Sequence, residues 1–550
     1  MKKFFTAFLC SASVLALTFN VYAESYSDVP QDFWAAESIQ KAGEYGFISG
    51  MGDGIFGVGE NVTKAQFISM VCRLFNWDII DYQYSSINDN QNPENWYYEY
   101  VETAALNGAI DKGGFFNPEN NITREEMAVI IINALGYSGL VGEAERENLL
   151  FSDVSDNKGY IALAYNFGLM SGKTADKFDP KGTAKREEAA AILTRCYEKL
   201  NSPTEFLHGF YAFSSYDQRE MASKMDAVSF GWSRMEYTNE KGVVLNTLSS
   251  NGNEWVVPSG YENIVNYLNE NDVKTHLNVF MSNGFNNSCD KVLNSEENRK
   301  AAIDAIIEEL SYDYKNLGFN PYGGVTIDFE NLKGSETKNN FNVFLKELKA
   351  ELDKTGKTLY VAVQPKLKTG SYFDGYDFKT IGDVADKVIV MAYDYAPSSI
   401  SQEVMDSGFT TTPVTPFDEV YVGLREIVSP ETGVSDKNKI VLGTSISNIG
   451  WTVKDGKIVN GTGSVLTQQD IINTIKNGNE VKYSKKYKNP YMNIADTNGN
   501  TIVWFENAQS IKDKITLAKM FGIKGVSVWR LGLIPENEET GMNIWSVLEK

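Results

Sequence analysis

Histidine and cysteine are scarce in this chain of 550 residues, which contains two histidines and four cysteines. His208 and His276 stand in strand-like runs without a CxxC or HxxxH partner, so the sequence predicts neither a metal site nor a cofactor. Three cysteines remain after the N-terminal segment, and an odd number is typical of buried thiols rather than of a disulfide framework: Cys72, Cys196 and Cys289.

Long apolar runs are missing beyond the N-terminus. Lys2 and Lys3 precede an apolar run that contains Cys10 and reaches about Phe19, and small residues follow at the positions that a signal peptidase reads. We interpret residues 1–23 as a signal peptide. No later stretch approaches the roughly 20 apolar residues of a membrane span, so the sequence predicts a secreted protein without one.

Positive charge is in deficit, since the formal net charge is −21 and the pI is about 4.7. This balance argues against sequence-independent binding to nucleic acid or to an anionic membrane, because both need a basic surface. The shares of hydrophobic residues (42%) and charged residues (22%) are those of globular proteins, and the length predicts several domains.

One pattern occurs three times in the first 200 residues, at a spacing of about 60 residues. Each copy begins with an Asp two residues after an apolar or aromatic one, followed by a predicted amphipathic helix, a Gly-rich turn and a second helix. Trp34 and Trp96 are expected within the first helix of their copies. Thr63 and Thr123 are each followed three residues later by Gln or Glu, which predicts capping boxes. A repeated supersecondary unit is therefore indicated.

This combination resembles the S-layer-homology (SLH) domain, with repeats predicted at residues 24–84, 85–147 and 148–200. The resemblance implies an α-helical, pseudo-threefold unit that binds secondary cell-wall polysaccharide, often pyruvylated, at the bacterial cell wall or surface layer. It assigns this binding to Lys64, Arg124 and Arg186, and a planar guanidinium suits the carboxylate of a pyruvate ketal. The chain departs from the SLH pattern at Lys64, Gln66 and Lys185. The alternative is that these basic residues are only solvated charges at helix starts.

From residue 204 onward, short β-rich runs alternate with amphipathic helical stretches, as a parallel sheet with helical crossovers requires. Eight strands predict an α/β fold, a (β/α)8 TIM barrel over residues 204–550, with a small α+β insertion at 451–504. The predicted strands are Leu207–Phe213, Ala227–Trp232, Thr275–Met281, Gly324–Phe329, Leu359–Gln364, Lys387–Met391, Ile440–Ser445 and Gly525–Trp529.

Two acidic residues stand at the end of the fourth predicted strand, Asp328 and Glu330. Alternate residues of a strand share a face, so we expect both carboxylates and Thr326 to point into the barrel mouth. Like charges at this separation raise one pKa, which keeps one carboxyl protonated as a general acid. The alternative is a pair of acids exposed to water at a strand end.

The region from about 205 to 550 resembles glycoside hydrolase family 18. Asp328 and Glu330 match the last two members of its DxxDxDxE motif, Met391-Ala392-Tyr393-Asp394 matches MxYD, and Trp529 matches the Trp beneath the sugar. The resemblance implies substrate-assisted retention, with Glu330 as general acid and base and Asp328 orienting the N-acetyl group of the sugar. It implies that Tyr393 and Asp394 assist by hydrogen bonding and that Trp529 stacks on the sugar. The other substrate-lining residues expected are Met391, Tyr211 and Gln364.

The chain departs from the family motif at Gly323 and Thr326, where aspartates are usual. Since the acid and the orienting aspartate remain, we expect an altered pH optimum or a lower rate. The sequence predicts a wall-anchored glycosidase that acts on an N-acetylglucosamine-containing polysaccharide, with peptidoglycan favoured over chitin. Two alternatives stay open, a lectin-like surface protein that binds glycan in the same cleft and a structural component of the surface layer.

Overall fold

The computed structural model describes residues 26–248, 256–284, 288–368, 374–393, 395–407, 413–496 and 499–549. The predicted signal peptide lies outside these residues, and so does Asp394. The chain forms two compact units, one of residues up to 124 with 181–194, the other of residues 125–180 with 195–550.

The first unit is organised around three turns that each precede a helix. Their central residues form a closed ring of backbone hydrogen bonds, in which Val62 donates to Ala184 (3.1 Å), Ala184 to Ile122 (3.0 Å) and Ile122 to Val62 (2.9 Å). All three side chains are fully buried. The ring satisfies amides that burial would otherwise leave unpaired, and it fits the predicted pseudo-threefold arrangement.

Helices lie before and after each of these turns, which confirms the predicted helical character of the repeats. Thr63 forms the predicted capping box with Gln66. Trp34 and Trp96 were expected within the first helices of their repeats, but they lie just before those helices and are 60% and 58% exposed. The bounds are α1 (Ala36–Glu44), α2 (Lys64–Leu74), α3 (Tyr98–Leu106), α4 (Arg124–Ala134), α5 (Val141–Ala144), α6 (Lys158–Asn166) and α7 (Arg186–Leu200).

The aspartate that opens each repeat binds the backbone of the loop before the next helix. Asp28 accepts hydrogen bonds from the amides of Phe56 (2.7 Å), Gly57 (2.7 Å) and Val58 (3.0 Å). Burial alone would raise the pKa of Asp28, but these amides hold it below its usual value. Amide pairs bind the equivalent aspartates in the same way: Phe116 and Asn117 on Asp89, Phe178 and Asp179 on Asp153.

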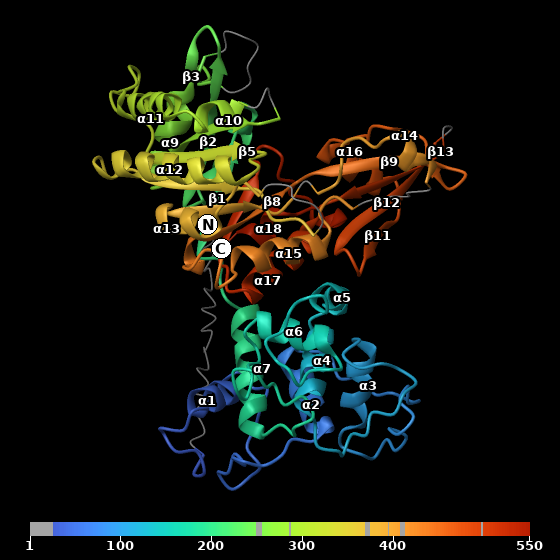
Figure 1. The fold of residues 1–550 in the computed structure, drawn as a ribbon. Coiled ribbons are helices and arrows are strands. Elements are labelled where there is room, and N and C mark those ends of the chain that lie inside the picture. Colours follow the sequence, from blue (N-terminus) through green and yellow to red (C-terminus); the bar gives the residue numbers. More distant parts are fainter. Residues whose placement is uncertain are drawn as a thin grey trace, which may run out of the picture. The chain divides into compact units, whose positions relative to one another are not determined.

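The second unit contains a closed barrel of eight parallel strands, as predicted (Figure 1). The sheet is closed because the first strand pairs with both the second and the last. A short strand, β3 (Gly242–Asn246), pairs antiparallel with the end of the second strand and forms a hairpin with it. The barrel strands are β1 (Phe206–Tyr211), β2 (Ala227–Thr238), β4 (Lys274–Ser282), β5 (Gly324–Glu330), β6 (Thr358–Val363), β7 (Lys387–Met391), β8 (Ile440–Ser445) and β14 (Gly525–Trp529).

Helices cover the outer face of the barrel. In one contact between a strand and a helix, the ring of Phe329 on β5 stacks on the ring of Phe344 on α12, with 5.4 Å between ring centroids. The longer helices are α9 (Tyr261–Glu270), α11 (Glu296–Ser311), α12 (Ser335–Asp353), α13 (Phe378–Val384), α15 (Phe417–Ile427) and α17 (Ala508–Met520). The short ones are α8 (Arg219–Ala222), α10 (Ser288–Leu293), α14 (Gln402–Asp406) and α18 (Trp545–Leu548).

The insertion between β8 and α17 is a second, antiparallel sheet with one helix (Figure 1). It begins three residues before the predicted boundary, and its first and last strands pair directly, Asn448 with Phe505. Trp451, Ile458 and Trp504 form part of its own apolar core. The elements are β9 (Asn448–Lys454), β10 (Lys457–Ile458), α16 (Gln468–Lys476), β11 (Val481–Ser484), β12 (Asn489–Asp496) and β13 (Gly499–Phe505).

Within the described residues, no single helix combines the length and the apolar composition needed to cross a membrane. One pair meets those two criteria together, α4 and the segment Ser138–Ala144, which are bent by 110° relative to each other.

Replacement of Asp28 by alanine is expected to destabilise the first unit by about 1–2 kcal/mol, because three backbone amides lose a charged acceptor. The measurement is the midpoint of thermal unfolding followed by circular dichroism. Asp32→Ala removes an exposed acid of the same loop and serves as the control. Equal midpoints for the two variants would contradict the role given to Asp28.

Candidate active site

Asp328 lies on the inner face of β5 and is only 3% exposed. Its Oδ2 accepts a hydrogen bond from Asn278 Nδ2 on the neighbouring strand (3.4 Å), whereas its Oδ1 receives none from any described residue. Burial raises the pKa of Asp328 to about 6, although the Asn278 hydrogen bond acts in the opposite direction. Asp328 therefore keeps one buried carboxyl oxygen without a hydrogen-bond donor among the described residues.

A chain of neutral hydrogen bonds crosses the barrel around Thr326, two residues before Asp328. Thr326 Oγ1 lies 2.6 Å from Ser229 Oγ and 3.2 Å from His276 Nδ1. His208 continues the chain from Ser229 (2.8 Å) to Ser527 (2.7 Å). Burial lowers the pKa of His208 to about 3, and it lowers the pKa of His276 well below its usual value. Both rings are therefore neutral, and they place no cation beside Asp328.

Glu330 is the last residue of β5 and is partly exposed. Neighbouring loops hold the backbone on either side of it, since Asn283 donates to the Glu330 carbonyl (3.0 Å) and Tyr376 donates to the Phe329 carbonyl (2.7 Å). The amide of Asn331 donates to Gln364 Oε1 (2.7 Å). Gln364, expected to line the substrate site, thus contacts the backbone beside Glu330.

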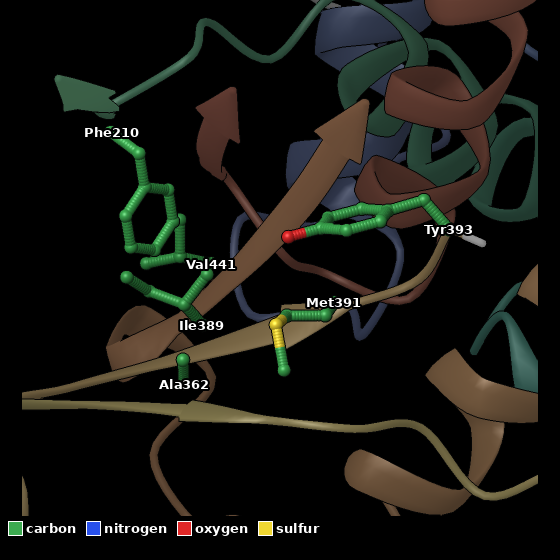
Figure 2. Packing of buried hydrophobic residues seen from close by; sticks show 6 residues of the cluster. All are labelled: Phe210, Ala362, Ile389, Met391, Tyr393 and Val441. Atoms are coloured by element: carbon green, nitrogen blue, oxygen red, sulfur yellow. The ribbon is translucent and has the colours of Figure 1, made fainter. Parts of the chain in front are cut away.

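Met391 and Tyr393 belong to a buried cluster at the end of β7, and Trp529 packs against it. Figure 2 shows the side chains of Met391 and Tyr393 next to each other, with Phe210 on the opposite side of the cluster. Trp529 meets Phe210 edge to face, at 5.2 Å between ring centroids. The structure thus brings three of the predicted residues together, while Asp394 lies outside the described residues.

The expectation that Tyr211 lines the sugar site needs correction. Its ring packs against Phe230 (5.3 Å between centroids) and Trp232 (6.4 Å) and is almost fully buried. His208 and Phe210 take the inner positions of β1, so the alternation of the strand turns Tyr211 to the outer face.

A cleft of about 870 Å³ begins at Trp529 and Ser445, at the ends of two barrel strands, and extends across the insertion. Asp328 and Glu330 are not among the described residues that line it. Its far wall comes from α16 and from the loop after β14. None of these contributions could be assigned from the sequence, because they come from segments far apart along the chain.

The three basic residues expected to bind wall polysaccharide begin α2, α4 and α7. Arg186 is 6% exposed and donates to the carbonyls of Phe56 (2.8 Å) and Ser49 (2.7 Å), which ties its guanidinium to the protein. Arg124 is also buried, with Nη1 3.5 Å from Glu188. Lys64 is more exposed, and its ammonium group lies 5.9 Å from the Phe116 ring centroid.

The described cysteines are all buried, as predicted, and their thiols are free. Within the described part of the chain, no group of three or more His, Cys, Asp or Glu side chains could hold a metal ion.

Two family profiles match the chain. That of Glycosyl hydrolases family 18 matches residues 185–533, more than half of the chain. That of the S-layer homology domain matches three segments, residues 25–68, 91–128 and 150–190.

Among curated proteins, the cortical fragment-lytic enzyme of Bacillus subtilis (strain 168) is 25% identical over 252 residues, which are 45% of this chain and 53% of that enzyme. The S-layer protein of Bacillus thuringiensis subsp. finitimus is 28% identical over 200 residues, 35% of this chain and 24% of that protein. The chain thus spans about half or less of the length of these relatives.

Among solved structures, the C-terminal domain of a putative chitinase from Desulfitobacterium hafniense DCB-2 is similar, with a TM-score of 0.50 and 20% identity. The match covers 63% of this chain and 99% of that domain. At this identity the likeness shows the fold alone.

Replacement of Asp328 by asparagine is expected to stabilise the protein at neutral pH. Because folding raises the pKa of this acid from 3.8 to about 6, the free energy of unfolding of the wild type falls as the pH rises through that window. The penalty above pH 6 is up to about 3 kcal/mol. The new side-chain oxygen can still accept the hydrogen bond from Asn278 Nδ2.

The measurement is the unfolding midpoint of wild type and Asp328→Asn between pH 4 and pH 8. The midpoint of the variant should be higher at pH 8, and the difference should shrink toward pH 4. Asp304→Asn, at an exposed position, should show no such pH-dependent gain. A variant less stable than wild type at pH 8 would disprove the burial penalty.

Proposed function

The chain belongs to glycosyl hydrolases family 18 and carries three S-layer homology repeats, and on this premise we propose that it is a wall-anchored, retaining hydrolase of β-linked N-acetylglucosamine glycans. The observation that carries the proposal is the pair of acids at the end of β5. Asp328 and Glu330 occupy alternate positions of one strand, the first buried and the second partly open to solvent.

Glu330 is proposed as the general acid, and later the general base, of the reaction. Its place at the barrel mouth allows it to protonate the glycosidic oxygen, after which the N-acetyl oxygen of the substrate attacks the anomeric carbon. The backbone contacts of Asn283 and Tyr376 beside Glu330 hold the strand end in place during this transfer.

Asp328 is proposed to orient the attacking acetamido group. Its Oδ1 accepts the amide N–H of the sugar, and its negative charge stabilises the positive oxazolinium intermediate. Because the His208 and His276 rings are neutral, nothing in that hydrogen-bond chain neutralises this charge. Tyr393 and Asp394 are proposed to hydrogen-bond to the distorted sugar, and Trp529 to stack on its apolar face.

Peptidoglycan is the substrate proposed over chitin. The support is the relative from Bacillus subtilis, whose name describes it as acting on cortical fragments. The S-layer homology repeats add support, because attachment to the wall would hold the barrel close to that polymer.

The repeats are proposed to attach the secreted protein to secondary cell-wall polysaccharide, with Lys64, Arg124 and Arg186 at the binding grooves. Lys64 is the most exposed of the three. The two arginines also support the fold through contacts with protein groups, so their replacement affects more than binding.

Glu330→Gln is expected to lower hydrolysis of peptidoglycan by about 10²–10⁴-fold, because it removes the proton donor. Release of reducing sugar from purified peptidoglycan and from chitin oligosaccharides is the measurement, together with binding to each glycan. Glu336→Gln, at an exposed position in the first turn of α12, is the control and should keep full activity. If wild type and Glu330→Gln both bind glycan and release nothing, the protein is a lectin.

Lys64→Ala is expected to weaken sedimentation of the full chain with purified cell walls and to leave its unfolding midpoint unchanged. Arg186→Ala should weaken sedimentation and also lower the midpoint, because two carbonyl contacts are lost. Arg73→Ala, an exposed basic residue further along α2, is the control for charge. Undiminished sedimentation of Lys64→Ala and Arg186→Ala would place the binding site elsewhere.

A further inference from the structure

The cleft that begins at Trp529 has a wall that sugar binding alone does not explain. It starts at Trp529, which is the only aromatic residue among the described residues that line it. Much of the remaining wall is aliphatic, although polar residues also line it; the aliphatic residues include Ile446, Ile449, Leu466, Ile472, Leu533 and Ile534. Sugar rings pack well on flat aromatic faces, whereas an aliphatic wall is complementary to methyl-bearing groups.

Part of this aliphatic surface faces solvent at the rim. Val465 is 73% exposed and Leu533 is 40% exposed, one on the insertion and one on the loop after β14. The two charged residues of the lining, Lys476 and Glu536, are exposed as well. Apolar side chains that line a cleft on both sides and are rimmed by charge mark a surface that is covered when a ligand binds.

Two residues that line the cleft each carry a buried polar atom that receives no hydrogen bond from any described residue, Gln468 Oε1 and Ser447 Oγ. The Gln468 amide is held in place, because its Nε2 donates to the Ile446 carbonyl (2.7 Å). Its Oε1 is therefore a fixed acceptor for an N–H group, and the Ser447 hydroxyl can donate to a carbonyl. Buried polar atoms of this kind are satisfied when the correct ligand supplies the partners.

Aliphatic walls with one fixed acceptor and one hydroxyl are the complement of a short peptide. We infer that the insertion binds the lactyl-peptide arm of a muramic acid residue, next to the sugar that Trp529 holds, and so selects peptide-bearing glycan strands. Methyl groups of the arm pack on Ile472 and Leu533, and a peptide N–H donates to Gln468. An acetamido group would contact only a small part of a cleft of this size. The inference rests on the proposed function and names the substrate class of the same site.

The test compares two substrates, glycan strands with stem peptides and the same strands after an amidase has removed the peptides. The double variant Val465→Ser with Leu533→Ser changes two exposed positions, so the fold is preserved. We expect it to lower the ratio of kcat/KM on peptide-bearing strands to that on peptide-free strands about fivefold, since two apolar contacts are weakened. Val459→Ser, an exposed aliphatic position of the insertion outside the cleft lining, should leave the ratio unchanged.

An unchanged ratio in the double variant would overturn the inference. If the wild type hydrolyses neither substrate, the proposed function fails, and binding decides the inference separately. In that case Glu330→Gln should bind peptide-bearing strands at least fivefold more tightly than peptide-free strands, and the double variant in the same background should lose this preference. Equal binding of both strands would reject the peptide site.

Discussion

The burial of one carboxyl group, that of Asp328, is the constraint on which the rest of the site depends. A closed parallel barrel places this group among packed strands, where ionisation is unfavourable, and a single hydrogen bond from Asn278 offsets only part of the cost. The surrounding chain of serine, threonine and histidine side chains satisfies its own polar atoms without adding charge. The carboxyl thus keeps one oxygen for a ligand, at the expense of stability.

The part of the site that the sequence predicted is the part that depends on local geometry. The alternation of Thr326, Asp328 and Glu330 follows from the period of a strand and needs no knowledge of neighbours. Asn278 was missed, because its contact with Asp328 depends on the register between β4 and β5, in which Asn278 is opposite Thr326. Tyr211 was misplaced because alternation along the first strand does not show which of its two faces points inward, and His208 and Phe210 take the inner positions.

In the repeats, too, the sequence predicted features that depend on neighbouring residues and missed those that depend on residues far apart in the chain. Capping at Thr63 is readable from spacing, since Gln66 follows three residues later. The hydrogen bonds that Asp28 accepts were not predicted, because their donors lie 28 to 30 positions further along the chain. The exposure of Trp34 and Trp96 could not be read from the sequence, because a shift of two residues in the start of a helix moves a side chain from the core to the surface. The ring through Val62, Ile122 and Ala184 joins residues more than 50 positions apart and ties the turns into one cooperative structure.

The pairing of Asn448 with Phe505 means that the chain leaves the barrel and returns to it at neighbouring points. Closure of the eight strands is thus indifferent to the length and content of the intervening segment. The segment can therefore be lengthened or replaced without disturbing the barrel strand that carries Asp328 and Glu330.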